Sequence, residues 1–224
     1  MAFYPGGKKR LGREIAERIA EIADEYDIRG YCEPFLGMAG VYRHIPSLLG
    51  RKKYLAGDGN EYLIRLWDAV QNGWRPPSHQ ISKSEYERYR SSKSLTALFY
   101  GFAASYLGDF RSGYFDKNNI EKQAEDMIEI GEELQDVKLS HGDYKQFSKV
   151  KGFIFYCDVP YHGTRQNYYD GDHRADRFDH DRFIDWALDM ARHNLVFISE
   201  YTKPCREAKL VWSHGKEKLF LLNP

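Results

Sequence analysis

The stretch that most constrains the fold of this chain is a run of five apolar or aromatic residues that ends directly in an aspartate. Residues 153–157 read Phe-Ile-Phe-Tyr-Cys and are followed by Asp158, Val159, Pro160 and Tyr161. A short apolar run bounded by a proline is typical of a strand that is buried on both faces. The sequence therefore predicts a central strand that carries a carboxylate to the edge of a sheet.

The residues after this strand predict a stiff loop with two hydrogen-bond acceptors and an aromatic ring. Pro160 holds the preceding residue in an extended conformation, so the Val159 carbonyl and the Asp158 carboxylate can point the same way. Tyr161 adds a ring face. Two acceptors beside a flat ring suit a flat base with an amino group, but a simple turn at a strand end explains the same four residues.

Composition and length narrow the class of protein. The 33 Lys and Arg residues balance the 33 Asp and Glu residues, so a surface for nucleic acid has to be a local patch. Cys32, Cys157 and Cys205 lack metal-ligand spacing, and we expect neither a disulfide framework nor a metal site. No apolar run approaches the roughly 20 residues that span a bilayer, and no signal-peptide core is present. We expect a cytoplasmic protein that is not secreted and has no membrane partner.

Two turns rich in small residues precede the central strand. Residues 4–8 read Tyr-Pro-Gly-Gly-Lys and lead into apolar residues at helical spacing. Residues 31–41 predict a strand, a loop of small residues and the start of a helix. Such a loop lets a ligand approach the backbone, and the helix start offers unpaired amides. A nucleotide or adenosyl group would fit there, although close packing of a strand against a helix also requires small residues.

Two further acidic residues follow predicted strands. Residues 53–57 predict a strand that ends in Asp58, about 20 residues beyond the second glycine turn, where doubly wound sheets place an acid that accepts hydrogen bonds from ribose hydroxyls. Residues 137–144 predict another strand, and we expect its Asp143 to lie beside a bound adenine ring.

Between residues 71 and 136 the alternation of strand and helix stops, which predicts an insertion with a separate role. Residues 82–93 form a helix-compatible surface suited to phosphate contacts, although two glutamates dilute its charge and an ordinary solvated helix fits equally well. Residues 98–115 predict a compact platform of glycines and aromatics rather than a regular helix. The cations of the insertion that we select for nucleic-acid contacts are Lys83, Arg88, Arg90, Lys93 and Arg111. Arg111 suits a guanine edge or a phosphate, or a pairing with Asp109.

The rest of the chain predicts how the sheet is completed. Residues 120–134 form an amphipathic helix that returns the chain to the sheet. The polar residues 164–179 are too many for a mere connection, and we interpret them as a substrate-covering loop. A helix near residues 183–190, a strand at 195–198 and a final hairpin follow. This order predicts a mostly parallel sheet, covered on both faces, that closes with an antiparallel hairpin.

In the order of these motifs the chain resembles the DNA adenine methylase family, and among its members the compact phage and viral type. The resemblance is carried by Pro-Gly-Gly-Lys at 5–8, Glu-Pro-Phe-Leu-Gly at 33–37, the acid at 58, the insertion, and only then Asp-Val-Pro-Tyr at 158–161. Gly-Phe-Ala-Ala-Ser-Tyr at 101–106 and Phe-Ile-Ser-Glu-Tyr at 197–201 are also similar. The resemblance covers nearly the whole chain.

This resemblance implies a fold, an activity and a domain division. The fold would be the Rossmann-like methyltransferase α/β fold, with an S-adenosylmethionine-binding catalytic domain in residues 1–70 and 137–224. Residues 71–136 would form a small, mainly helical target-recognition domain. The expected reaction is methylation of the exocyclic N6 amine of a flipped-out adenine in double-stranded DNA, without a metal. We expect a monomer or weak dimer from a bacterial or phage-infected cell, in a restriction-modification or phage setting.

The resemblance also assigns residues to roles. Asp158 and the Val159 carbonyl would accept the two amine hydrogens, Pro160 would stiffen the loop, and Tyr161 would stack on the base. The cofactor-binding residues implied are Tyr4, Gly7, Lys8, Glu33, Phe35, Gly37, Asp58, Asp143 and Asp158.

Two departures from the family pattern leave other functions open. Val159 replaces the usual first proline, although the role proposed for it uses only its carbonyl. Ala39 stands where a second glycine is common. The alternatives are a DNA-binding homologue with weak or no activity, and a methyltransferase that acts on RNA or on a protein amide.

Overall fold

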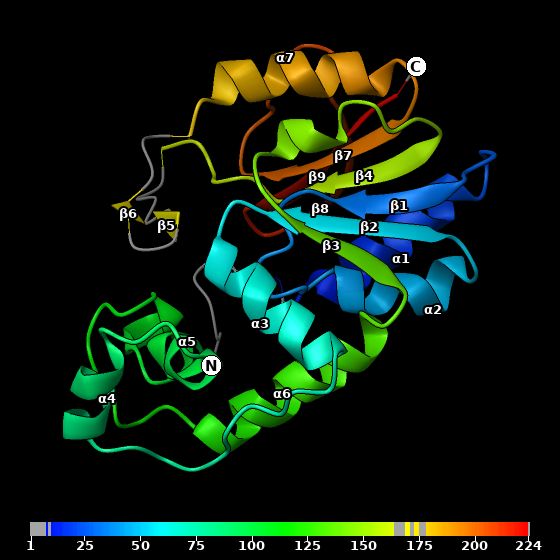
Figure 1. Cartoon of the computed structure of the whole chain (residues 1–224). Helices are drawn as coiled ribbons and strands as arrows, with labels where there is room; N and C mark the ends of the chain where they lie inside the picture. Colours follow the sequence, from blue (N-terminus) through cyan, green and yellow to red (C-terminus); the bar gives the residue numbers. More distant parts are fainter. Residues whose placement is uncertain (1–7, 9, 164–168, 171–172, 175–177, 224) are drawn as a thin grey trace.

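The computed structural model describes residues 8, 10–163, 169–170, 173–174 and 178–223. Its centre is a seven-stranded sheet with the order β3-β2-β1-β4-β7-β9-β8. Helix α7 covers one face of this sheet, and α3 and α6 lie on the other side (Figure 1). The chain therefore has the α/β architecture, with helices on both faces, that the alternation of strands and helices predicts.

The first five strands of this order are parallel, and the last two are antiparallel. The sheet reverses its order between β1 and β4, as doubly wound sheets do. The predicted fold class, a Rossmann-like sheet with an antiparallel hairpin at its end, is confirmed. The strands are β1 (Gly30–Glu33), β2 (Lys53–Asp58), β3 (Val137–His141), β4 (Phe153–Cys157), β7 (Leu195–Glu200), β8 (Lys209–His214) and β9 (Glu217–Leu222). A separate antiparallel pair consists of β5 (Tyr169–Asp170) and β6 (His173–Arg174).

The strands have hydrophobic residues on both faces, which explains the unbroken apolar runs in the sequence. Along β4, Ile154 and Tyr156 join one hydrophobic cluster, whereas Phe153 and Phe155 join a second cluster. The first cluster includes side chains of α1, α3 and α6, and the second includes those of α7. Because successive strand residues point to opposite faces, one apolar run supplies both layers.

Most helices begin at a polar side chain that accepts a backbone N–H. Asn60, Ser82, Ser94, Asn119 and Asp179 cap five successive helices in this way. The α-helices are α1 (Gly12–Ala23), α2 (Ile45–Leu49), α3 (Glu61–Gln71), α4 (Lys83–Tyr89), α5 (Leu95–Ala103), α6 (Ile120–Glu133) and α7 (His180–Ala191). Three short 3-10 helices are η1 (Tyr42–His44), η2 (Tyr106–Gly108) and η3 (Tyr144–Phe147). None of the helices in the described ranges is both long and apolar enough to cross a membrane.

Helix α5 corrects one prediction. Residues 98–115 do not form an irregular platform throughout, because Leu95–Ala103 is a regular helix whose residues 97–103 are all buried. A buried helix is apolar on every side, so its sequence lacks the amphipathic pattern that identifies a surface helix. Position 101 has no room for a side chain, because the Phe110 ring lies 2.5 Å from the place where a Cβ would be.

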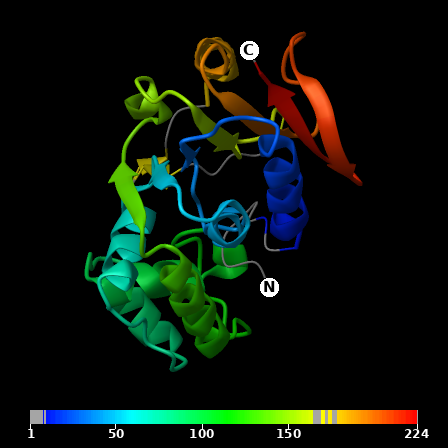
Figure 2. The ribbon, with the colours of Figure 1, turned by 90° about the vertical axis from the view of Figure 1, so that its right-hand side faces the viewer.

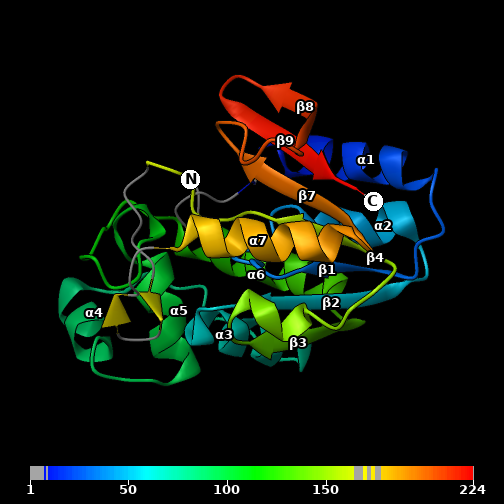
Figure 3. The same ribbon diagram turned by 90° about the horizontal axis from the view of Figure 1, so that it is seen from above.

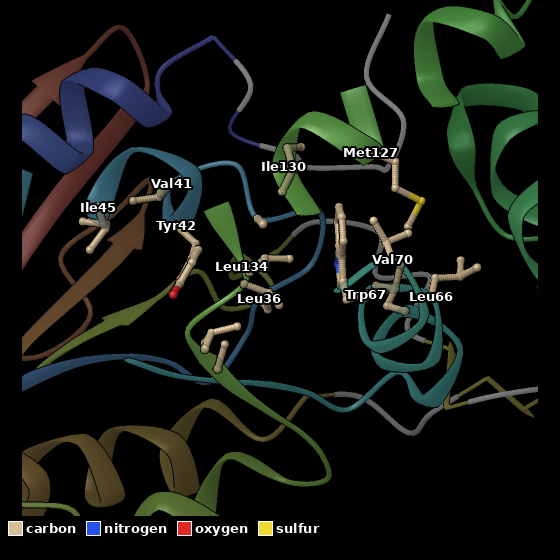
Figure 4. Close-up of a cluster of buried hydrophobic side chains, with 14 of the residues drawn as sticks. Leu36, Val41, Tyr42, Ile45, Leu66, Trp67, Val70, Met127, Ile130 and Leu134 are labelled. Carbon is tan, nitrogen blue, oxygen red and sulfur yellow. The ribbon is translucent and has the colours of Figure 1, made fainter. Parts of the chain in front are cut away.

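Helix α6 packs on the body of the molecule, whereas α4 and α5 lie together to one side (Figure 1). Met127 and Ile130 of α6 gather around Trp67 and Val70 of α3 (Figure 4). A Cβ at Gly131 would lie 2.3 Å from Val70 Cγ1, so the two helices approach closely there. The division of the chain at residues 70 and 136 stays a prediction, and within 71–136 the last helix shares the hydrophobic core of the sheet.

The inserted segment with α4 and α5 contacts the start of α3, directly after β2. The Tyr62 and Phe110 rings are 5.2 Å apart, and Arg65 donates a hydrogen bond to the Lys93 carbonyl at 3.0 Å. Figure 3 shows α4 and α5 at the end of the molecule toward which the arrowhead of β7 points. The hairpin β8–β9 lies instead beside α1, away from α4 to α6 (Figure 2). The insertion is therefore next to the carboxyl edge of the sheet.

Candidate active site

Three predicted acidic residues meet at the carboxyl edge of the sheet. Glu33 ends β1, Asp58 ends β2, and Asp158 follows β4. These strands are neighbours in the order β2-β1-β4 and run parallel. The order reverses between β1 and β4, and ligands of doubly wound sheets bind at the carboxyl ends of the strands beside such a reversal. The fold thus brings together residues that are 125 positions apart in the chain, from Glu33 to Asp158.

Three polar side chains form a cluster with Asp158. Lys8 Nζ lies 2.7 Å from Asp158 Oδ1 and 3.6 Å from Glu217 Oε1. The Tyr161 hydroxyl lies 3.2 Å from Asp158 Oδ1 and also contacts Glu217 Oε1. The lysine ammonium lies over the Tyr161 ring, 4.7 Å from its centroid. We refer to Lys8, Asp158, Tyr161 and Glu217 as the tetrad.

The tetrad is largely shielded from water. Burial and the neighbouring charges together shift the pKa values of Lys8 and Glu217. The exposed fractions of the Lys8, Asp158 and Glu217 side chains are 8%, 20% and 12%. Burial alone would lower the pKa of Lys8, but the charges of Asp158 and Glu217 outweigh burial and raise it. Burial raises the pKa of Glu217, against the opposing effect of Lys8. The Lys8 ammonium is therefore retained as the cation between two carboxyl groups.

Hydrogen bonds from the described part of the chain reach only one of the two Asp158 carboxylate oxygens. Both hydrogen bonds that Asp158 accepts from the described residues, from Lys8 and Tyr161, end on Oδ1. A carboxylate oxygen at Oδ2 can accept from a donor such as an amine. The side chain is half-buried rather than sealed in the core, so a ligand can approach it.

The loop that carries Asp158 is held from two sides. His180 Nε2, at the start of α7, donates to the Pro160 carbonyl at 2.7 Å. The His162 backbone N–H donates to Glu200 Oε2 at 2.8 Å, at the end of β7. The Tyr161 ring packs edge-on against Tyr201, with centroids 4.5 Å apart. Val159 itself is buried, in the cluster under α7.

The second glycine turn is joined directly to Asp58. The Gly37 N–H donates to Asp58 Oδ2 at 2.8 Å, and the Asn60 N–H donates to Oδ1 at 2.8 Å. Trp67 Nε1–H donates a hydrogen bond to the Gly37 carbonyl at 2.8 Å. Gly37 has φ 49° and Ala39 has φ 53°, a conformation in which an alanine costs roughly 1 kcal/mol more than glycine. The Ala39 side chain is fully buried in the main hydrophobic cluster.

Two of the acidic residues hold protons more tightly than usual. Burial raises the pKa of Asp58, opposed by the backbone N–H groups of Asn60 and Gly37. Burial raises the pKa of Glu33 well above its ordinary value, although the hydrogen bond from the Tyr31 hydroxyl, 2.7 Å long, opposes this change. Perturbed carboxyl groups of this kind are common at functional sites and also occur in structural networks.

Phe35 belongs to an aromatic cluster beside this edge. Its ring lies 5.5 Å from Tyr144, 5.8 Å from Phe178 and 5.7 Å from Phe183, measured between centroids. Tyr144 follows β3, and the turn before it is near Asp58, because Gly142 N–H donates to the Asp58 carbonyl at 3.0 Å. The cluster forms an apolar wall next to the polar tetrad and the glycine turn.

Asp143 has a local structural role that the sequence did not predict. The strand β3 ends at His141, earlier than expected. Asp143 is exposed, and its Oδ1 accepts from Lys145 N–H at 2.8 Å, which caps η3. A contact of Asp143 with a cofactor stays a prediction.

The nucleic-acid candidates fall into two groups. Lys83, Arg88, Arg90 and Lys93 are exposed. Among them, Arg88 lies 3.9 Å from Glu85 and Arg90 lies 3.2 Å from Glu87, each one turn along α4. Arg111 is half-buried, donates to the Ser92 carbonyl at 2.5 Å, and has its guanidinium 4.6 Å from the Phe110 ring centroid. The first group reaches the surface, whereas Arg111 is largely engaged in packing within the insertion.

Sequence reasoning missed Glu217, Glu200 and His180. Glu217 is one charged residue of a hairpin, and no local pattern marks it. The predicted final hairpin could have indicated its place, because a last strand that runs antiparallel to β7 brings its first residue to the carboxyl edge of β7. Tyr4, Gly7 and most of the predicted loop at 164–179 lie outside the described residues. Among the described residues, no group of three or more His, Cys, Asp or Glu side chains is arranged to hold a metal ion.

Comparison with known proteins gives a partial match to one family. The family model described as D12 class N6 adenine-specific DNA methyltransferase matches residues 4–101. No curated protein matches the chain.

A solved structure with a similar arrangement is the rRNA methyltransferase aviRa from Streptomyces viridochromogenes. The sequences are 12% identical, the TM-score is 0.47, and the match covers 99% of this chain and 85% of that one. The matched residues 4–101 include the glycine turns, β1, β2 and Asp58. Over these residues the chain matches the N6 adenine-specific DNA methyltransferase family, and the resemblance to the adenine methylases is confirmed.

Proposed function

We propose that this protein is an S-adenosylmethionine-dependent methyltransferase that modifies the exocyclic N6 amine of adenine in double-stranded DNA. The observation that carries the proposal is the Asp158 carboxylate, which is held on Oδ1 by Lys8 and Tyr161 while Oδ2 can accept from an amine. The family match over residues 4–101 supports the same reaction.

The residues at the sheet edge fit an adenosyl cofactor. Each Asp58 oxygen accepts one backbone N–H among the described residues, and a carboxylate oxygen can accept about two hydrogen bonds, so capacity remains for ribose hydroxyls. Glu33 and Lys8 offer a carboxyl group and an ammonium close to Asp58 and Asp158, and Phe35 gives an apolar wall. These groups suit the hydroxyls, charges and ring of such a ligand.

The chemistry requires a nucleophilic amine, an electrophilic methyl group and a dry, ordered site. S-adenosylmethionine, when bound, supplies the methyl group on a sulfonium. We propose that Asp158 and the Val159 carbonyl accept hydrogen bonds from the two N–H groups of the adenine amine. These bonds favour a pyramidal nitrogen with an available lone pair. Tyr161 would stack on the base after it has left the duplex.

Substrate binding is assigned to the inserted segment, in residues 71–136. Its exposed cations Lys83, Arg88, Arg90 and Lys93 lie on the segment that packs beside the carboxyl edge of the sheet. Contacts from such side chains to phosphates would position DNA over the site without reading its sequence. We propose this segment as the target-recognition domain.

The test is methyl transfer from labelled S-adenosylmethionine to unmethylated plasmid DNA, with Asp158→Ala as the inactive variant. Asp189→Ala is the matched control, because Asp189 is an exposed aspartate of α7 with a side chain that is 71% accessible. We expect label in N6-methyladenine from wild type and from the control, and a loss of at least about 100-fold in Asp158→Ala. Parallel reactions with RNA and with denatured protein test the two alternative substrates.

The results separate the functions under comparison. Label in DNA adenine that depends on Asp158 supports the proposal. Label only in RNA or in a protein amide would replace it with one of the alternative methyltransferases. Cofactor binding without transfer to any substrate would favour a DNA-binding homologue.

A further inference from the structure

Glu217 is the member of the tetrad to which the proposed reaction gives no task. It is the first residue of β9, its side chain is 12% exposed, and its Oε1 contacts both Lys8 and Tyr161. A second buried carboxyl group beside Asp158 raises the energy of the site, because two like charges close together disfavour ionisation, and the Lys8 ammonium that contacts both groups offsets part of this cost.

The antiparallel hairpin explains how a residue so far along the chain enters the site. Strand β9 runs antiparallel to β7, with Glu200 opposite Lys218. The start of β9 therefore lies at the carboxyl end of β7, the same edge that carries Asp158 after β4. A parallel strand at this position would have placed its last residue there instead.

The number of hydrogen-bond donors in the tetrad limits the role that Glu217 can have. A tyrosine hydroxyl has one proton to donate, and Tyr161 has two carboxyl oxygens within reach. The Tyr161 hydroxyl contacts Glu217 Oε1 and lies 3.2 Å from Asp158 Oδ1, and its single proton can be donated to only one of them at a time. If the Tyr161 hydroxyl donates its hydrogen bond to Glu217, Asp158 is held mainly by its 2.7 Å ion pair with Lys8.

We propose that Glu217 is a positioning residue of the active site, which fixes the Tyr161 ring and the Lys8 ammonium so that Asp158 meets the target amine in one orientation. This inference rests on the proposed function. Glu217 itself would touch neither the base nor the methyl group. Its effect would pass through Tyr161, whose ring is also held edge-on by Tyr201.

The titratable groups that face Glu217 come from several elements. Lys8, Asp158 and Tyr161 are the tetrad partners, and Tyr201 lies on the far side of the Tyr161 ring. On the adjacent strand β8, His214 pairs in register with Glu217, and its Nδ1 lies 3.5 Å from Glu14. Burial raises the pKa of Glu217 above its usual value of 4.5. Protonation would remove the negative charge of Glu217 and leave a weaker, neutral acceptor for Tyr161, so positioning should weaken as pH falls through this raised pKa.

The activity test compares Glu217→Gln with wild type, with Glu132→Gln as the control because Glu132 is an exposed glutamate of α6. We expect a kcat about 10-fold lower, since a small misplacement of reacting groups has effects of this size or larger. The KM for DNA should change less than about 2-fold, because DNA binding is assigned to the cations of the insertion and a positioning role acts on the reacting groups. The acid limb of the kcat profile should move to lower pH in Glu217→Gln.

A second readout does not depend on activity. In protein with 13Cζ-labelled tyrosine, the Tyr161 resonance is identified by its absence in Tyr161→Phe. In wild type this resonance should titrate with a midpoint above pH 4.5, and the step should vanish in Glu217→Gln but persist in Glu132→Gln. The wild-type titration alone tests the contact if the Glu217→Gln protein does not fold.

The outcomes distinguish this inference from the proposed function. If wild type transfers no methyl group but the Tyr161 step behaves as stated, the proposed function is wrong and the contact between Glu217 and Tyr161 stands. If wild type is active and Glu217→Gln keeps its kcat, its pH profile and its Tyr161 signal, the positioning role is overturned. A wild-type Tyr161 signal that does not titrate also overturns it.

Discussion

Charges at the carboxyl edge of the sheet and charges on the inserted segment are arranged in opposite ways. At the edge, Lys8 is 8% exposed and lies between two carboxyl groups. On α4, Arg88 is 77% exposed and pairs with Glu85 at 3.9 Å. A buried charge depends on its partners, whereas an exposed pair contributes little to stability. The charges at the edge are therefore held in a fixed geometry by their partners, whereas those of α4 face the solvent.

Aromatic residues show the same contrast. In the insertion, Tyr89 stacks on Tyr100 with centroids 5.4 Å apart, and Phe102 packs on Phe110 at 4.6 Å. Tyr100, Phe102 and Phe110 belong to the main hydrophobic cluster, and Tyr89 packs against it, so the high aromatic content there is mostly structural. At the edge, by contrast, Tyr161 combines a ring with hydrogen bonds to charged groups.

The largest expected effect compares two glycines, one in each region. A Cβ at Gly12 would lie 1.9 Å from the Gly40 backbone carbonyl, and no side chain can move to relieve that contact. We expect Gly12→Ala to lower the free energy of unfolding by more than about 3 kcal/mol. Gly101→Ala meets the Phe110 ring, which can shift, and should cost about 1 to 2 kcal/mol.

Urea denaturation of the two glycine variants measures this difference. Gly59→Ala is the control, because nothing lies within 4 Å of a Cβ at that position. Equal losses for Gly12→Ala and Gly101→Ala would mean that the edge is no more rigid than the insertion.

The next effect compares two lysines. Lys8→Met leaves Asp158 and Glu217 close together without their cation, and we expect methyl transfer to fall by about 100-fold, or roughly 2.7 kcal/mol in the barrier. Lys93→Met should keep kcat at saturating DNA, but lower DNA affinity a few-fold and reduce the salt slope by about 1. Steady-state kinetics and DNA binding at several salt concentrations give both quantities. If Lys93→Met damaged kcat as much as Lys8→Met, the separation of catalysis from DNA contact would be wrong.

A smaller effect concerns the pH dependence of stability. The pKa of Glu33 is raised by burial, so the folded protein binds its proton more tightly than the unfolded chain does. This contribution to stability is full below about pH 4.5 and is lost as pH rises through the raised folded pKa. Glu33→Gln should flatten that decline and be about 1 kcal/mol more stable than wild type at neutral pH. Melting temperatures from pH 4 to 8 check this, and exposed Glu132→Gln should leave the curve unchanged.

The smallest effect belongs to the exposed arginines of α4. Arg88→Ala and Arg90→Ala should each change the free energy of unfolding by less than about 0.5 kcal/mol, because exposed pairs contribute little. Each should weaken DNA binding about 2- to 3-fold at low salt, and less at high salt. Fluorescence anisotropy with a labelled duplex measures the affinity. An unchanged affinity in the double variant would remove α4 from the DNA interface.

Much of the sheet and of the residues at its carboxyl edge was predictable because the signals in the sequence are local. The apolar run before Asp158, the small residues around Gly37 and the strand that ends in Asp58 each lie within a few positions. Strand order and parallel pairing then bring their ends together. The irregular platform predicted for residues 98–103 was wrong, because a fully buried helix has no distinctive period in the sequence, and the cap that Asp143 forms on η3 has no such signal either.

The sequence by itself determined the alternation of strands and helices, the carboxylate after the central strand and the family resemblance, since these depend on residue type and short spacing. The tertiary structure alone decided that Glu217 joins Lys8 and Tyr161, and that α6 packs with α3 on the sheet domain. The physical reason is that antiparallel return and helix packing join residues across long separations. Lys8 and Glu217 are 209 positions apart in the chain, and only folding places their side chains 3.6 Å from each other.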